Sequence, residues 1–143
     1  NYHLSFQVKQ ELRIKTFAFF NKAGEFNVEG LRDALAAELA LSKKVGLILN
    51  FPNNPSGYSL SPSEQDKVVS CLASLATKDK KIVALVDDAY FGLFFSEKVA
   101  KTSIFQQLSR ASQNIMAVKL DGATKEHYAW GLRVGFVTFG ISG

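Results

Sequence analysis

The sequence predicts an α/β fold, in which a mostly parallel sheet is covered by helices on both faces. Two features of the 143-residue chain favour this class. Short continuous apolar runs, typical of strands buried on both faces, alternate with segments whose apolar residues recur at helical spacing. This alternation indicates right-handed crossovers between parallel strands. We therefore expect a single α-β-α sandwich whose last strand runs antiparallel.

The composition excludes several classes of protein. The chain is 47% hydrophobic and 21% charged, which is ordinary for a soluble globular domain. No apolar run approaches the roughly 20 residues that span a bilayer. The net charge of +4 comes from lysines and arginines scattered along the sequence, so we expect neither a nucleic-acid nor a membrane partner. The single cysteine, Cys71, excludes an internal disulfide framework and favours a cytoplasmic location.

Apolar spacing and capping residues predict the first elements. A helix is expected over 2–12, a strand over 15–21 and a second helix over 28–41, which Asn27 can cap. The apolar run 45–51 then predicts a buried strand, because it ends in a loop of proline, asparagine and glycine. This is the first of the three clearest strands in the sequence.

A capping box opens the next helix. Ser61 and Glu64 stand three residues apart with a proline at the first helical position, and the helix is expected to end near Thr77. A similar capping pattern at Ser103 predicts a further helix that includes Leu108. Three more strands are predicted from the apolar runs 82–86, 114–120 and 133–140. The connection before the last strand is about a dozen residues and glycine-rich, which favours an antiparallel return.

The three clearest strands lead to polar residues that could take part in chemistry. Asn54, Asp87 and Lys125 follow them, and ligands of parallel sheets bind at the carboxyl ends of the strands. We therefore expect these three residues to lie together at one edge. Asp88 should point to the opposite face from Asp87, because successive residues of a strand alternate. The two carboxylates could alternatively bind a divalent metal, but no further ligand has suitable spacing, so we expect no metal.

These residues suit pyridoxal phosphate, a cofactor that combines an aldehyde with a phosphate. Lys125 can form a Schiff base with the aldehyde, and Arg133, eight positions later, can neutralise the phosphate. Asp87 can keep the ring nitrogen protonated. Tyr90 and Asn54 can donate to the ring oxygen, which tunes the reactivity of the imine.

Three motifs stand in order along the chain: NFPNNPSG at 50–57, DDAYFGL at 87–93 and KEHYAWGLRVGF at 125–136. They resemble the Asn-Pro-Thr-Gly loop, the Asp-x-Ala-Tyr segment and the lysine with its Gly-Leu-Arg-x-Gly run of the class I and II aminotransferases, which are pyridoxal-phosphate enzymes of fold type I. The resemblance extends from Phe17 to Gly140. It implies that the cofactor is bound by Asn54, Asp87, Ala89, Tyr90, Lys125 and Arg133, with Ala89 near the ring face and Lys125 as the catalytic residue.

One position departs from the family pattern. The family commonly has a serine three residues before the lysine as a phosphate ligand, and Gly122 stands there instead. Thr124 or a backbone N–H would have to substitute for it. A missing neutral hydrogen bond costs about 1 kcal/mol, which is too little to overturn the resemblance.

The resemblance implies an aminotransferase that moves an amino group from an amino acid to a 2-oxo acid and works as a homodimer. Family members are much longer, so we expect residues 1–143 to be the central part of the large, cofactor-binding domain, inactive alone and with Lys125 exposed. Two alternatives remain open. The chain could belong to a pyridoxal-phosphate sensor domain of a transcription regulator, or to a related lyase or decarboxylase.

Overall fold

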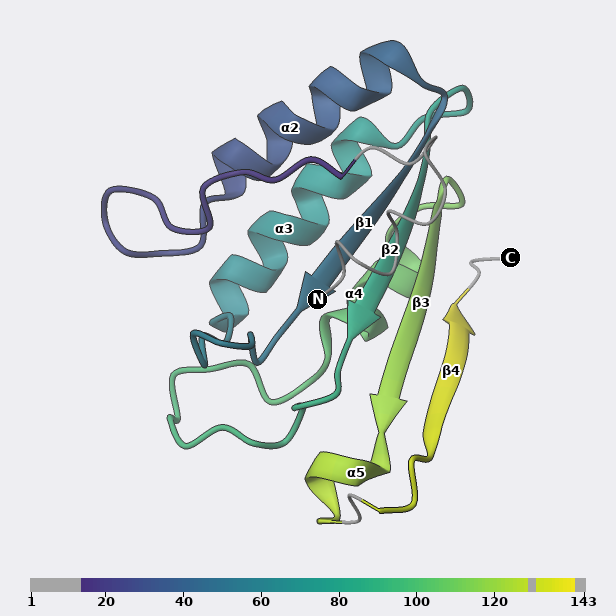
Figure 1. Cartoon of the computed structure of the whole chain (residues 1–143). Helices are drawn as coiled ribbons and strands as arrows, with labels where there is room; N and C mark the ends of the chain where they lie inside the picture. The colour runs from purple at the N-terminus through teal and green to yellow at the C-terminus, as the bar shows by residue number, and fades with distance from the viewer. Residues whose placement is uncertain (1–13, 129–130, 141–143) are drawn as a thin grey trace.

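The structure is a computed structural model that describes residues 14–128 and 131–140. In these residues four strands form one sheet in the order β1-β2-β3-β4 (Figure 1). Their bounds are β1 (Lys44–Asn50), β2 (Lys81–Asp87), β3 (Ile115–Gly122) and β4 (Gly135–Gly140). The first three are parallel, and β4 pairs with β3 in the antiparallel direction. The predicted sheet, mostly parallel with an antiparallel last strand, is confirmed.

The described helices are α2 (Val28–Leu41), α3 (Pro62–Leu75), α4 (Ile104–Ala111) and the one-turn α5 (Ala123–Glu126). All three predicted caps are present, including Ser103, whose side chain accepts the N–H of Phe105 at 3.1 Å at the start of α4. The side chain of Asn27 accepts the N–H of Gly30 at 3.0 Å, and Ser61 and Glu64 form a complete capping box at the start of α3. The predicted helix over 2–12 lies outside the described residues.

Helices α2, α3 and α4 pack against one face of the sheet. Strands β1, β2 and β3 follow one another in space as they do in sequence, so both crossovers step across the sheet in the same direction. Because parallel crossovers have one hand, α3 and α4 fall on the same side. The helices and strands share one core cluster, which includes Leu31, Val68, Val86, Leu108 and Ala117. No described helix packs on the other face, so the second helical layer stays a prediction.

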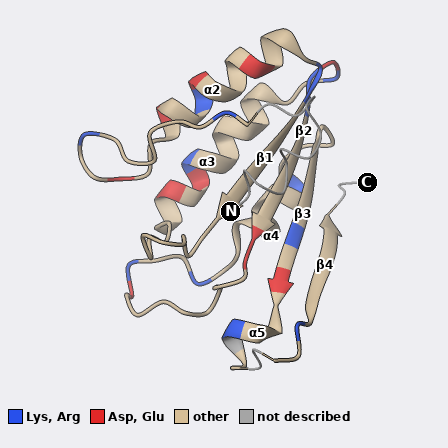
Figure 2. Cartoon of the chain, viewed as in Figure 1, with Lys and Arg blue, Asp and Glu red and all other residues tan. Residues whose placement is uncertain are grey.

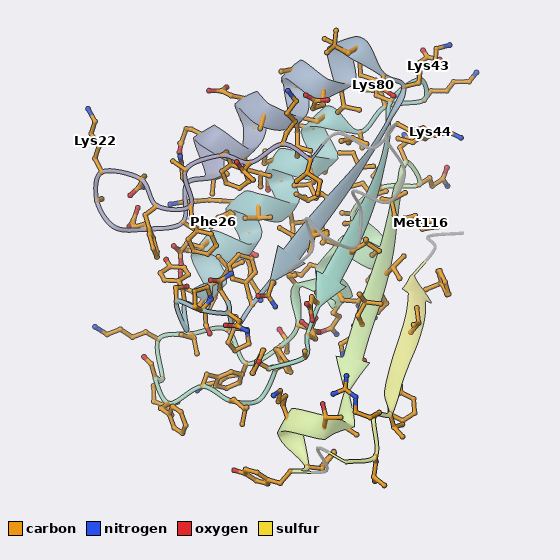
Figure 3. The ribbon with its side chains drawn as sticks, in the orientation of Figure 1. Lys22, Phe26, Lys43, Lys44, Lys80 and Met116 are labelled. Carbon is orange, nitrogen blue, oxygen red and sulfur yellow. The ribbon has the colours of Figure 1, made fainter. Side chains whose placement is uncertain are left out.

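The predicted strand over 15–21 is wrong. Phe20 makes an isolated bridge with Phe26, and the rest of the segment forms no strand. Phe17 and Phe19 pack edge-to-face on Phe26 instead, with ring centroids 5.9 and 5.3 Å apart, and Figure 3 labels Phe26. The run of aromatic residues is therefore explained by packing against the core, which gives burial without a strand partner.

Candidate active site

The carboxyl ends of β1, β2 and β3 lie level at one edge of the sheet. Asn50 of β1 is paired with Asp87 of β2, and Asp87 is paired with Leu120 of β3. Figure 2 shows charges of both signs near this edge, at the ends of β2 and β3. Figure 3 labels three lysines at the opposite end of the sheet: Lys43, Lys44 and Lys80. The level strand ends are what allow distant loops to meet here.

Asn54, Tyr90 and Lys125 come together at this edge from three different segments. Asn54 lies in the loop after β1, Tyr90 in the turn after β2, and Lys125 in α5 directly after β3. The side-chain amide of Asn54 donates to the Tyr90 hydroxyl at 3.4 Å. The Lys125 ammonium lies 5.5 Å from the centroid of the Tyr90 ring. Asn54 and Tyr90 also line an open hollow of about 230 Å³.

Asp87 is held by contacts to both neighbouring segments. Its Oδ1 accepts the N–H of Ala89 at 3.1 Å, and its carbonyl accepts from Nδ2 of Asn50 at 3.2 Å. The Oδ1 of Asn50 also accepts the N–H of Asn54 at 2.9 Å. Asn50 therefore ties the loop after β1 to the end of β2. It was not among the predicted site residues, although a polar residue near the end of an apolar run was an available signal.

We expected Lys125 to be exposed, but it is half-buried. The reason is that α5 folds beside the turn that bears Tyr90.

Arg133 lies exposed just before β4. Its backbone is left-handed, with φ 50°, which is uncommon for a residue other than glycine. Within the described residues no hydrogen bond or ion pair joins it to the other site residues. A Cβ at Gly122 would lie 3.6 Å from the Thr124 hydroxyl, so that hydroxyl is close to the position of the family's serine.

Asp88 lies on the face opposite to Asp87, as predicted from strand alternation; this is the helix-covered face, and Asp88 is 5% exposed. The Lys119 ammonium lies 3.7 Å from Oδ2 of Asp88 and 2.7 Å from Oδ1 of Asp121. Burial raises the pKa of Asp88 to about 6, because the hydrogen bond from Ser103 and the charge of Lys119 only partly offset the lost hydration. Burial alone would lower the pKa of Lys119, but the Asp121 and Asp88 carboxylates outweigh it and raise that pKa.

No group of three or more histidine, cysteine or acidic side chains in the described part of the chain is arranged to hold a metal ion.

A second polar cluster is centred on the buried Glu64, at the start of α3. Glu64 accepts the N–H of Phe26 at 3.1 Å, the N–H of Ser61 at 2.8 Å and the hydroxyl of Tyr58. Burial raises the pKa of Tyr58 to about 12, and its hydrogen bond to Glu64 adds to the effect. Burial would also raise the pKa of Glu64, but its hydrogen bonds from Tyr58, Ser61 and Phe26 outweigh burial and lower that pKa.

A family model described as aminotransferase class I and II matches residues 2–140. The chain belongs to the class I and II aminotransferase family. One similar solved structure is an aminotransferase from Anaerococcus prevotii DSM 20548, with a TM-score of 0.77 and 35% sequence identity. The match covers 90% of this chain and 31% of that one. A comparison with curated proteins gave no match.

Two more distant solved aminotransferases share the fold. One is from Escherichia coli, with a TM-score of 0.63 and 15% identity over 82% of this chain and 25% of that chain. The other is the aromatic-amino-acid aminotransferase from Burkholderia pseudomallei covalently bound to pyridoxal phosphate. Its TM-score is 0.65 and its identity 17%, and the match covers 99% of this chain and 33% of that chain. The chain thus spans a third or less of these aminotransferases. None of the described helices is long and apolar enough to cross a membrane.

Proposed function

We propose that this chain is the central part of the large domain of a pyridoxal-phosphate-dependent aminotransferase, which transfers an amino group from an amino acid to a 2-oxo acid. The observation that supports this most is the convergence of Asn54, Tyr90 and Lys125 at the edge where Asp87 ends β2. An amine, a carboxylate and two donors at one edge match the groups that the cofactor needs. The B. pseudomallei aminotransferase, which shares the fold, is covalently bound to pyridoxal phosphate, and this supports the same cofactor here.

Lys125 is the catalytic residue of the proposal. When bound, pyridoxal phosphate supplies an electron sink that stabilises negative charge on the neighbouring substrate carbon. Lys125 would hold the cofactor through its amine, and the same amine, when free, would accept and return a proton at that carbon. Its half-buried position beside Tyr90 keeps the amine near the hollow that Asn54 and Tyr90 line.

The other residues orient and tune the cofactor. Asp87 would hold the ring nitrogen protonated, since a charge pair at about 4 Å is worth about 4 kcal/mol at an effective dielectric of about 20. Asn54 and Tyr90 would donate to the ring oxygen, and Ala89 would lie against the ring face. Thr124 and Arg133 would bind the phosphate, with the Thr124 hydroxyl in place of the family's serine.

We further propose that the whole protein is longer than this chain and acts as a cytoplasmic homodimer. The chain covers only 31% of the A. prevotii enzyme. Three large apolar side chains of β4 are more than half exposed: Phe136 at 61%, Val137 at 57% and Phe139 at 62%. An apolar edge strand of this kind is a favourable surface for further chain or for a partner subunit.

The whole enzyme provides the test. Borohydride should fix pyridoxal phosphate to the peptide that contains Lys125, and Lys125→Ala should abolish both fixation and amino transfer. Lys101→Ala is the matched control, because Lys101 lies outside the site and pairs with the exposed Glu97. Fixation that persists in Lys125→Ala would overturn the assignment. Rapid amino transfer between amino acids and 2-oxo acids would exclude the sensor alternative, and product analysis would separate lyases and decarboxylases.

A further inference from the structure

We propose that a charged cluster, made of the buried Asp88 and the half-buried Lys119 and Asp121, positions the turn that bears Asp87 and Tyr90. The cluster lies on the helix-covered side of the sheet, behind the residues that would face the cofactor. It joins the end of β2 to β3, the strand that leads directly to Lys125 in α5. This inference rests on the proposed function, because it concerns how the same site is held in place.

The cluster fixes the turn through both backbone and side chain. The N–H of Asp88 donates to the carbonyl of Leu120 at 3.0 Å, so pairing with β3 continues one residue beyond β2. The carbonyl of Asp88 accepts the N–H of Phe91 at 2.9 Å, which closes the turn around Tyr90. With the Asp88 side chain anchored behind the sheet, strand alternation directs Asp87 to the other side. The direction of Asp87 therefore depends on the anchoring of its neighbour.

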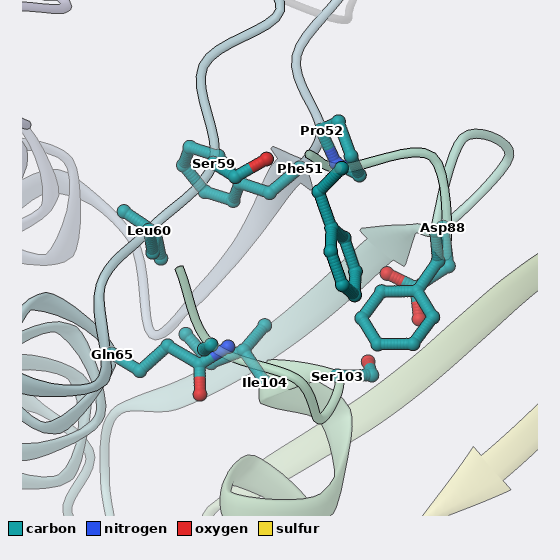
Figure 4. Close-up of a pocket in the computed structure, with 11 residues that line it drawn as sticks. Phe51, Pro52, Ser59, Leu60, Gln65, Asp88, Ser103 and Ile104 are labelled. Atoms are coloured by element: carbon teal, nitrogen blue, oxygen red, sulfur yellow. The ribbon is translucent and has the colours of Figure 1, made fainter. Parts of the chain in front are cut away.

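Stability alone does not explain why a carboxylate is buried here. The side chain of Asp88 is 2% exposed, and its Oδ2 has no hydrogen-bond partner within the described residues, although it lies 3.7 Å from Lys119. Figure 4 shows Asp88 and Ser103 beside a small cavity of about 20 Å³ that is otherwise lined largely by apolar side chains such as Phe51. A buried ion pair with incomplete hydrogen bonding contributes little to stability. A role in positioning the turn accounts for a carboxylate at this place.

Lys119 connects the parts of the cluster. It belongs to β3, and its side chain lies on the same face of the sheet as Asp121, two residues later. Its ammonium bonds Asp121 at 2.7 Å and reaches Asp88 at 3.7 Å, and it also lies 5.9 Å from the centroid of the Phe91 ring. Lys119 thus contacts both ends of the turn that spans residues 88–91.

The test uses the whole enzyme and the variant Lys119→Met, which keeps the aliphatic length and removes the charge. We expect its Kd for pyridoxal phosphate to rise about 10-fold, which corresponds to a loss of about 1.4 kcal/mol. In the cofactor-free protein, amide hydrogen exchange at Asp88 and Phe91 should become about 10-fold faster. Lys119→Arg should restore both quantities to within about twofold of the native protein. Lys101→Met, which breaks an exposed ion pair, should leave both unchanged.

A second variant guards against loss of folding. Asp88→Asn keeps the size of the side chain and should weaken cofactor binding about 10-fold without lowering the melting temperature. A Kd within twofold of the native value in both variants would overturn the inference, and so would weaker binding without faster exchange at the turn. If the native enzyme binds no pyridoxal phosphate, the proposed function fails. Hydrogen exchange still tests the cluster in that case, and unchanged exchange in Lys119→Met refutes it.

Discussion

Replacing Asp88 by asparagine should change how the stability of the protein depends on pH. The Asp88 side chain is 2% exposed, and burial raises its pKa from 3.8 to about 6. The folded protein therefore binds this proton more tightly than the unfolded chain does. The contribution of Asp88 to the free energy of unfolding is highest below pH 4, falls as the pH rises from about 4 to about 6, and is constant above that.

The size of the effect follows from the pKa. A change from 3.8 to about 6 corresponds to about 3 kcal/mol between the two protonation states. Asparagine does not titrate, so the difference in unfolding free energy, variant minus native, should increase by about 2 kcal/mol between pH 4 and pH 7; the rest of the change falls just outside this range. The sign is fixed by the pKa: asparagine becomes more favourable as the native carboxyl ionises.

Urea denaturation at pH 4, 5, 6 and 7 measures this difference, and subtraction removes the contributions of all groups that both proteins share. Glu64→Gln is the matched control, because the pKa of Glu64 is lowered and its contribution has the opposite sign. A difference for Asp88→Asn that is independent of pH, or that decreases towards pH 7, would contradict a raised pKa for Asp88. In that case burial would not be the main influence on Asp88.

Three further predictions concern the core, the Glu64 cluster and the site. The folded protein lowers the pKa of Glu64 below its ordinary value of 4.5, so Glu64 stabilises the protein above pH 4.5 and this stability is lost as the pH falls through the lowered pKa. Glu64→Gln should therefore make the unfolding free energy, measured in urea, less dependent on pH on the acid side. An unchanged pH dependence there would contradict this. Leu72 is fully buried, and Leu72→Ala should cost about 2 to 5 kcal/mol of unfolding free energy by urea titration, whereas a cost below 1 kcal/mol would mean that the core collapses around the cavity. Thr124→Val in the whole enzyme should lose a hydrogen bond worth about 1 kcal/mol and so weaken pyridoxal phosphate binding about fivefold, whereas Thr124→Ser should keep it. Fluorescence titration measures the affinity. Equal affinities of the native enzyme and Thr124→Val would remove Thr124 from the phosphate site.

The sequence determined those features that depend on residues close together along the chain. The caps at Asn27 and Ser61 were predictable because a cap joins residues two or three positions apart. The strands of the sheet were predictable from their apolar runs. The grouping of Asn54 and Lys125 also followed, because the carboxyl ends of parallel strands meet at one edge whatever the strand order.

Features that depend on contacts between distant segments became visible in the folded structure alone. The sequential strand order placed α3 and α4 on one face, and the aromatic segment 15–21 packed on the core without entering the sheet. The position of Asn50 gave a signal in the sequence, but the partners of Asn50 and Lys119 could not be foreseen, because each depends on which residue of a neighbouring segment lies beside it. Local pattern predicts where an element forms, but pairing and packing energies decide what it touches.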